Sequence, residues 1–200
     1  MRKDTAMELF TTQREIDKID FTETNRAANL CILRKVADVM GKTDLLYNKN
    51  RGAEKGILDI SENTVSKICT LSYEPRRWKV EEVAENLKMD KRAFTGEFLI
   101  RIKGETFKEF QNLYIQDLEE ELKKYKKNSK QRERIEEMMQ IKPTEELLWY
   151  YILRSEKEEE DHDFMIALKK LLWTDLSVQI VDETFRDPQL WLFWNYLRKH

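Results

Sequence analysis

Glycine and proline are scarce in this chain of 200 residues, which contains five glycines and three prolines. Both residues form turns and end helices, so their scarcity argues against a fold built from many short elements joined by tight turns. Glu, Lys, Leu and Arg, which favour helices, are abundant, and charged residues make up 37% of the chain. Hydrophobic residues, at 40%, are sufficient for a core. The composition therefore predicts an all-α globular protein.

Cysteine and long apolar runs are also scarce. The two cysteines, Cys31 and Cys69, are too few for a typical secreted disulfide framework, and such residues are more often small buried side chains than nucleophiles. No apolar run approaches the roughly 18 residues that a membrane span needs, and the first residues lack the apolar core of a signal peptide. We therefore expect a cytoplasmic protein that does not bind a membrane.

Residues typical of catalytic and metal sites are few. The chain has two histidines, His162 and His200, and no glycine-rich phosphate loop ahead of a helix. The acidic run at 156–163 contains potential metal ligands, but a metal site needs ligands that converge at defined spacing, and adjacent carboxylates are usually solvated. We therefore expect neither an enzyme nor a metal or other cofactor.

Charge is unevenly distributed, although the net charge is only −2. Residues 26–110 contain 17 Lys and Arg against 13 Asp and Glu, a net of +4. Residues 111–200 contain 15 against 19, a net of −4. A mildly basic first half and an acidic second half fit a DNA-binding module joined to a protein-contacting module.

Hydrophobic periodicity predicts four parts in the chain. They are a polar arm or short helix at 1–25, a helix-turn-helix-like module at 26–110, a connecting helix at 111–134 and a helical C-terminal module at 135–200. The strongly basic end of the third part, at 123–134, is either an exposed helix between two halves or a hinge. Helices are predicted over about 22–40, 61–70, 78–88, 91–102, 106–127, 144–157, 162–173 and 188–198.

The most informative segment, residues 60–89, reads ISENTVSKICTLSYEPRRWKVEEVAENLKM. Ser61 can cap a short helix whose inner face carries Val65 and Ile68, and Pro75 marks a break before a second apolar-periodic stretch. This segment resembles the second half of the Cro/repressor-like helix-turn-helix domain, a family often called XRE. About 30 residues match closely. The matching positions are Ile60, Pro75, Ala84, Leu87 and Met89.

The resemblance implies that the helix after Ser61 enters the major groove of DNA. Asn63 would then pair with adenine, and Lys67 with guanine or a phosphate. Trp78 is interpreted as a core anchor, while its charged neighbours contact phosphates or are simply loop charges. The implied DNA-binding residues are Glu62, Asn63, Thr64, Lys67, Arg76, Arg77 and Lys79.

One departure from the family concerns the scaffold helix that should precede the recognition helix. The segment between Gly41 and Ile60 is about eight residues longer than in the family, and the family's apolar–Ala pair is replaced by Glu54 and Lys55. We therefore expect this scaffold helix to be distorted or displaced.

A competing alignment is to the AraC type of helix-turn-helix. Residues 80–110 resemble one such unit, in which Asp90 would cap a DNA-reading helix. The implied DNA-binding residues are then Lys91, Arg92 and Thr95. AraC-type domains carry two such units, and the chain contains no second copy.

The C-terminal stretch WLFWNYL, at 191–197, is apolar on nearly every side of a helix. Such a helix either packs deeply into its own subunit or forms a dimer or partner interface. The candidate interface residues are Trp191, Trp194 and Leu197.

Together these patterns predict a sequence-specific protein that binds double-stranded DNA, a transcriptional regulator acting as a homodimer. The alternative is a modulator or inhibitor of another protein, of the kind carried by phages and mobile elements, which keeps a repressor-like fold and binds its partner through the C-terminal module. A DNA-binding protein should lose affinity steeply as salt rises, whereas a hydrophobic protein interface should not.

Overall fold

The computed structural model describes residues 12–48, 55–71, 80–101, 106–141, 143–157, 170, 173–174, 177 and 187–200. Within these residues all regular structure is helical, which confirms the all-α prediction. No described helix combines the length and the apolar character that crossing a membrane requires. The elements are α2 (Gln13–Ile16), α3 (Thr22–Val39), the 3-10 helix η1 (Thr43–Leu45), α4 (Glu62–Cys69), α5 (Val80–Leu87), α6 (Arg92–Thr95), α7 (Thr106–Lys123), α8 (Lys130–Met138), α9 (Glu145–Lys157) and α11 (Pro188–Lys199).

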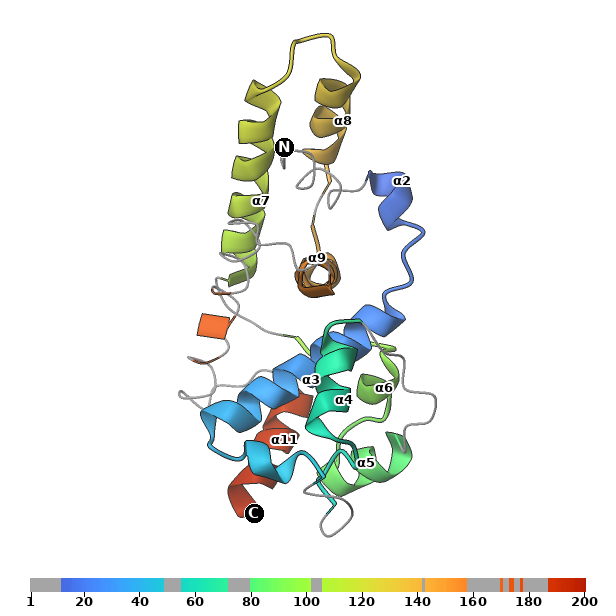
Figure 1. The fold of residues 1–200 in the computed structure, drawn as a ribbon, viewed down its shortest axis with the longest axis vertical. Coiled ribbons are helices and arrows are strands. Elements are labelled where there is room, and N and C mark those ends of the chain that lie inside the picture. The colour runs from blue at the N-terminus through green and yellow to red at the C-terminus, as the bar shows by residue number, and fades with distance from the viewer. Residues whose placement is uncertain are drawn as a thin grey trace.

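Helix α3 is the centre of the fold. An ordinary surface helix buries one apolar stripe, but α3 is apolar on almost every side between Ala27 and Ala37, where Arg34 and Lys35 are the charged exceptions. Helices α4, α6, α9 and α11 pack against it from different directions (Figure 1). Its side chains with at most 1% of their surface exposed are Ala27, Ala28, Leu30, Ile32, Leu33, Val36 and Ala37.

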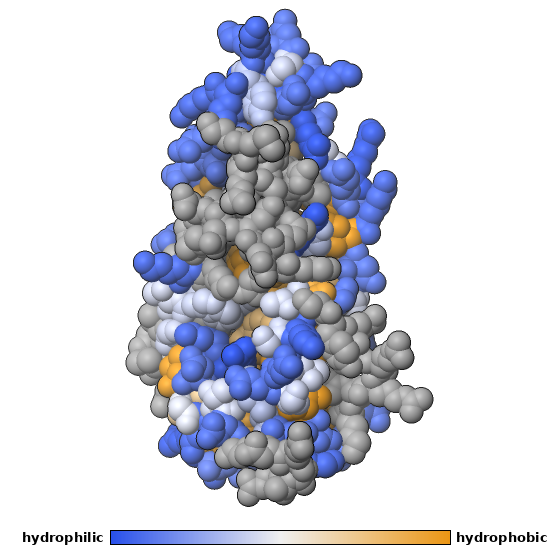
Figure 2. Space-filling view, viewed as in Figure 1, coloured by the Kyte–Doolittle hydropathy of each residue, from blue (hydrophilic) through white to orange (hydrophobic). Residues whose placement is uncertain are grey.

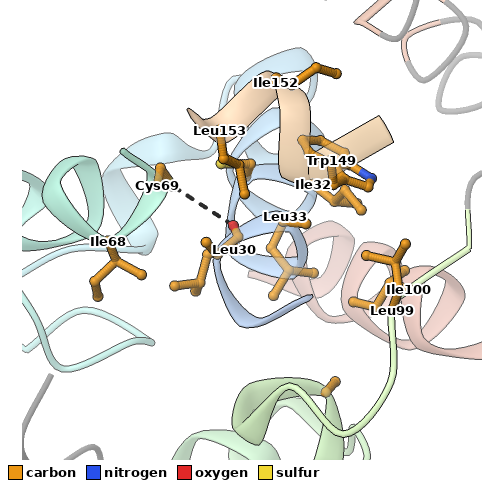
Figure 3. Close-up of a cluster of buried hydrophobic side chains, with 14 of the residues drawn as sticks. Leu30, Ile32, Leu33, Ile68, Cys69, Leu99, Ile100, Trp149, Ile152 and Leu153 are labelled. Carbon is orange, nitrogen blue, oxygen red and sulfur yellow. Dashed lines mark hydrogen bonds between the residues drawn. The ribbon is translucent and has the colours of Figure 1, made fainter. Parts of the chain in front are cut away.

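The two ends of the chain share this core. Trp149 and Leu153 of α9 lie beside Ile32 and Leu33 of α3 (Figure 3). Helix α11 packs against both α3 and α5. Helices of the predicted C-terminal module at 135–200 therefore lie on the same core as the predicted helix-turn-helix-like module, because α3 has more apolar surface than the helices near it in sequence cover.

Helices α7 and α8 form a hairpin at the end of the molecule opposite α5 and α11 (Figure 1). The Tyr114 hydroxyl donates to the Met138 carbonyl at 3.4 Å. The Ser129 hydroxyl oxygen caps α8 by accepting the backbone N–H of Arg132 at 3.2 Å. The basic stretch at 123–134 is thus the turn and the flanking helix ends of this hairpin, rather than a bridging helix or a hinge.

The helix predicted over 91–102 is much shorter than expected. Helix α6 ends at Thr95 because Gly96 adopts a φ of +83°, a conformation that favours glycine. A Cβ atom at Gly96 would lie only 2.0 Å from the carbonyl oxygen of Thr22 in α3. The close approach of α3 therefore requires glycine here, and the glycine ends the helix.

Candidate functional site

Helix α4 has a capped start and two different faces. The Ser61 hydroxyl oxygen accepts the backbone N–H of Thr64 at 3.2 Å, as the sequence predicts. Val65, Ile68 and Cys69 are buried on the inner face. The outer face exposes the side chains of Glu62, Asn63, Ser66 and Lys67, so three of the four predicted groove-facing residues share an accessible surface.

Thr64, the fourth, is only half-exposed. Its hydroxyl forms a hydrogen bond of 2.9 Å with the hydroxyl of Ser61. This contact holds the Thr64 hydroxyl at the N-terminal cap. Thr64 therefore stabilises the start of α4, and its hydroxyl is less available to a partner than the side chains of Asn63 and Lys67.

The inner face of α4 is fixed to α3. The Cys69 sulfur lies 4.0 Å from the carbonyl oxygen of Ala27, and Ile68 faces the buried side of α3 near Leu30 (Figure 3). At the exposed margin, Arg34 of α3 pairs with Glu62 at 3.5 Å, a contact that solvent weakens. The outer face is therefore presented by a helix that core packing holds in place.

The segment ahead of α4 differs from a regular helix-turn-helix. Residues 42–48 and 55–60 form η1 and a loop, with no α-helix among them. The loop is closed by backbone hydrogen bonds, in which Ile57 and Leu58 donate to the carbonyls of Leu45 and Leu46 at 2.9 and 3.0 Å. Helix α4 is therefore supported by α3, and residues 42–48 and 55–60 supply no scaffold helix. This agrees with the expectation that the long segment between Gly41 and Ile60 distorts or displaces that helix.

The predicted phosphate-contacting residues Arg76, Arg77 and Lys79 lie outside the described residues, as does Trp78. The following helix α5 is acidic on its outer side, where Glu81, Glu82 and Glu85 are exposed. This acidic side opposes the approach of phosphates to α5 itself.

The alternative site on α6 is small, and its charges are already paired. Lys91 and Arg92 are exposed, and Thr95 is half-exposed. The Arg92 guanidinium lies 2.6 Å from the Asp90 carboxylate, and the hydrogen bonds from Arg92 hold the pKa of Asp90 below its usual range. Lys91 pairs with Glu81 at 3.4 Å. Asp90 also accepts the backbone N–H of Arg92 at 2.9 Å, but the N-cap of this single-turn helix is Lys91, which makes no side-chain cap hydrogen bond.

The C-terminal candidates have different environments. Trp194 and Leu197 are 5% and 0% exposed within the chain's own core, so neither is accessible to a partner while α11 stays in place. Trp191 is 43% exposed and stacks on Trp194, with ring centroids 5.4 Å apart. Of the three candidates, only Trp191 presents its surface to solvent.

A carboxylate cluster surrounds Arg101. Its guanidinium lies 3.3 Å from Glu145 and 3.6 Å from Glu146, both at the start of α9. Its backbone N–H donates to Asp187, the cap of α11, at 2.9 Å. Burial raises the pKa of Glu145 to about 7, although Arg101 opposes this effect. No sequence motif marks the cluster, because its members come from three distant segments.

A cavity of about 300 Å³ lies where the loop after η1 meets α5 and α11. Lys55 and Asp59, which form an ion pair at 3.0 Å, lie on one wall. Its polar lining is completed by Glu82, Asn86, Tyr196 and His200. Within the part of the chain that the structure describes, no group of three or more His, Cys, Asp or Glu is placed to hold a metal ion.

Comparison of this chain with protein-family models, curated proteins and solved structures finds no match.

Proposed function

We propose that this protein binds double-stranded DNA through the outer face of α4 and acts as a homodimeric transcriptional regulator. The observation that carries the proposal is the exposure of Asn63 and Lys67 on one face of a helix whose other face is fixed in the core. An asparagine amide can bond both N6 and N7 of adenine, and a lysine can bond guanine. An α-helix with its side chains is about 10–12 Å across, so α4 fits within the roughly 12 Å width of the major groove.

The homodimer follows from the small size of this surface. One short helix contacts only a few base pairs, so two copies related by two-fold symmetry are needed for a site of useful specificity. Among the described residues, Trp191 of α11 is the exposed large apolar side chain. It is therefore a candidate contact between the two copies.

The test is fluorescence anisotropy with DNA from upstream of the protein's own gene and with a scrambled duplex, each over a range of salt concentrations. The variant Asn63→Ala with Lys67→Ala is expected to lose at least about tenfold of the preference for the native sequence, because each good base contact contributes about 1–3 kcal/mol of discrimination.

A matched control is available on α7, where Lys108 and Asn112 are exposed with the same spacing of four residues. Lys108→Ala with Asn112→Ala should leave the preference unchanged. Equal preference in the α4 variant and the wild type, with both chains folded, would refute the assignment to α4.

The second candidate function is modulation of another protein. It is favoured by the acidic outer side of α5 and by the lack of a scaffold helix in residues 42–48 and 55–60, since both make α4 unlike a regular DNA-binding unit. If this second function is correct, the protein should bind both duplexes weakly and with equal affinity. It should also stay bound to its protein partner at high salt.

A further inference from the structure

The highest concentration of positive charge in the chain lies at the outer end of the α7–α8 hairpin. We name residues 123–134 the hairpin tip. It contains seven Lys and Arg and one Glu, a net charge of +6. The whole chain carries −2, so the remaining residues together carry −8. The tip is thus strongly basic in a chain whose other residues are acidic in sum, although residues 26–110 carry +4.

The hairpin tip comprises the end of α7, the turn and the start of α8, at one end of the molecule (Figure 1), and its lysines are exposed. Three basic residues of the tip are paired with acidic residues outside it: Lys124 contacts Glu121, Arg132 lies 2.9 Å from Glu136, and Arg134 lies 3.9 Å from Glu15. The remaining lysines are exposed, and no described acidic side chain forms an ion pair with them. These are Lys123, Lys126, Lys127 and Lys130.

The fold does not require these four lysines. The hairpin is held together below the tip by buried Tyr114, Leu118, Ile135 and Met138. Like charges four residues apart on a helix or clustered in a turn are mildly destabilising. The lysine cluster therefore adds repulsion to the folded hairpin, and a polyanionic partner would relieve it.

We propose that the hairpin tip binds the phosphate backbone of double-stranded DNA without regard to base sequence. Duplex DNA carries one negative charge for about every 1.7 Å of its axis, so a cluster of unpaired lysines can contact several phosphates at once.

The surface chemistry of the tip favours nucleic acid over an anionic membrane. Membrane-binding basic helices insert exposed apolar side chains between lipids. Here the nearest large apolar residues, Leu122 and Tyr125, are only half-exposed, and the tip is covered by hydrophilic side chains in Figure 2. Glu119 and Glu120 are exposed on the stem below the tip, so attraction to phosphates is confined to the outer end of the hairpin.

This surface is distinct from the outer face of α4, and the inference goes beyond the proposed function because it requires no base contact. The two surfaces have separate signatures. Loss of α4 contacts should remove only the preference for native over scrambled DNA. Loss of tip contacts should weaken binding to both duplexes equally and reduce the dependence of affinity on salt.

The experiment replaces Lys123, Lys126, Lys127 and Lys130 with Gln and measures binding to scrambled and native duplexes by anisotropy. The slope of log K against log salt is about −0.9 per phosphate contact, so we expect it to become shallower by about 2–4. Affinity at moderate salt should fall at least about tenfold for both duplexes. The control replaces the same number of exposed lysines elsewhere: Lys18, Lys88, Lys108 and Lys199.

Circular dichroism shows whether both quadruple variants are folded. A tip variant that binds scrambled DNA with the affinity and salt slope of the control overturns the inference. Binding of the tip variant and the control variant to vesicles of mixed phosphatidylserine and phosphatidylcholine is also measured. Binding to vesicles that depends on the tip, without binding to DNA that depends on it, overturns the inference in favour of a membrane contact. Scrambled-DNA binding that depends on the tip, in a protein with no sequence preference, supports the tip and refutes the α4 proposal.

Discussion

Asn29 of α3 binds the backbone of α6 and of the segment that follows it, and its replacement should be severely destabilising. Its side chain is 2% exposed. The amide nitrogen donates to the carbonyls of Ala93 and Phe98 at 2.7 and 2.9 Å. The amide oxygen accepts the backbone N–H of Ile100 at 2.7 Å. One buried side chain therefore satisfies three backbone groups that lie more than sixty residues away.

The expected cost follows from those three groups. Asn29→Leu keeps the approximate size of the side chain but leaves two carbonyls and one N–H without their partner, each at about 1–3 kcal/mol. Allowing for relaxation and entry of water, we expect the free energy of unfolding to fall by about 3–6 kcal/mol. Domains are typically stable by about 5–15 kcal/mol, so this loss is a large fraction of the total.

Urea denaturation followed by far-ultraviolet circular dichroism measures this loss. Asn112→Leu, at an exposed position of α7, is the control and should change stability by less than about 0.5 kcal/mol. Asn29→Asp keeps the acceptor for Ile100 but places a carboxylate oxygen against two carbonyls, so it should also destabilise at neutral pH. An Asn29→Leu protein within about 1 kcal/mol of the wild type would refute the reasoning.

Two further predictions concern α9 and α11. Burial raises the pKa of the Glu145 carboxyl from 4.5 to about 7, so the folded state binds the carboxyl proton more tightly than the unfolded state does. As the pH rises from about 4.5 to about 7, ionisation of Glu145 therefore destabilises the fold increasingly. Glu145→Gln should therefore raise the melting temperature at pH 8 and leave it nearly unchanged at pH 4; the reverse order would contradict the assignment. Trp194→Ala should lower the free energy of unfolding by about 3–5 kcal/mol because Trp194 is buried in its own chain. Light scattering should give an unchanged solution mass, and a halved mass with unchanged stability would show instead that Trp194 lies between copies.

Local signals in the sequence were sufficient to predict most helix boundaries. Ser61 is a strong cap, and the predicted helix at 61–70 is found at Glu62–Cys69. The aromatic helix predicted at 188–198 is found at Pro188–Lys199, with Asp187 as its cap. The exposure of Asn63 and Lys67 also agrees with the predicted face, since a short amphipathic helix leaves few choices for its inner side.

Features that depend on distant contacts could not be predicted in this way. The glycine at position 96 ends α6 because the Thr22 carbonyl approaches it, and nothing near Gly96 in the sequence indicates that approach. Asn29 lies in an apolar stretch and reads as an ordinary polar interruption, although it satisfies three distant backbone groups. The core that the two predicted modules share could not be predicted for the same reason, because α3 is covered by helices that lie far from it along the chain.

The central position of α3 also sets the order in which this chain can mature during synthesis. Helices α9 and α11, which cover two sides of α3, emerge from the ribosome more than a hundred residues after it. Until then its leucines and isoleucines have no native partners, and such exposed surface is where nascent chains aggregate or bind chaperones. Contacts between residues so far apart also slow folding, because a long loop must close before they form. Full coverage of α3 therefore waits for α11, and arrest of translation before residue 187 would leave α3 only partly covered.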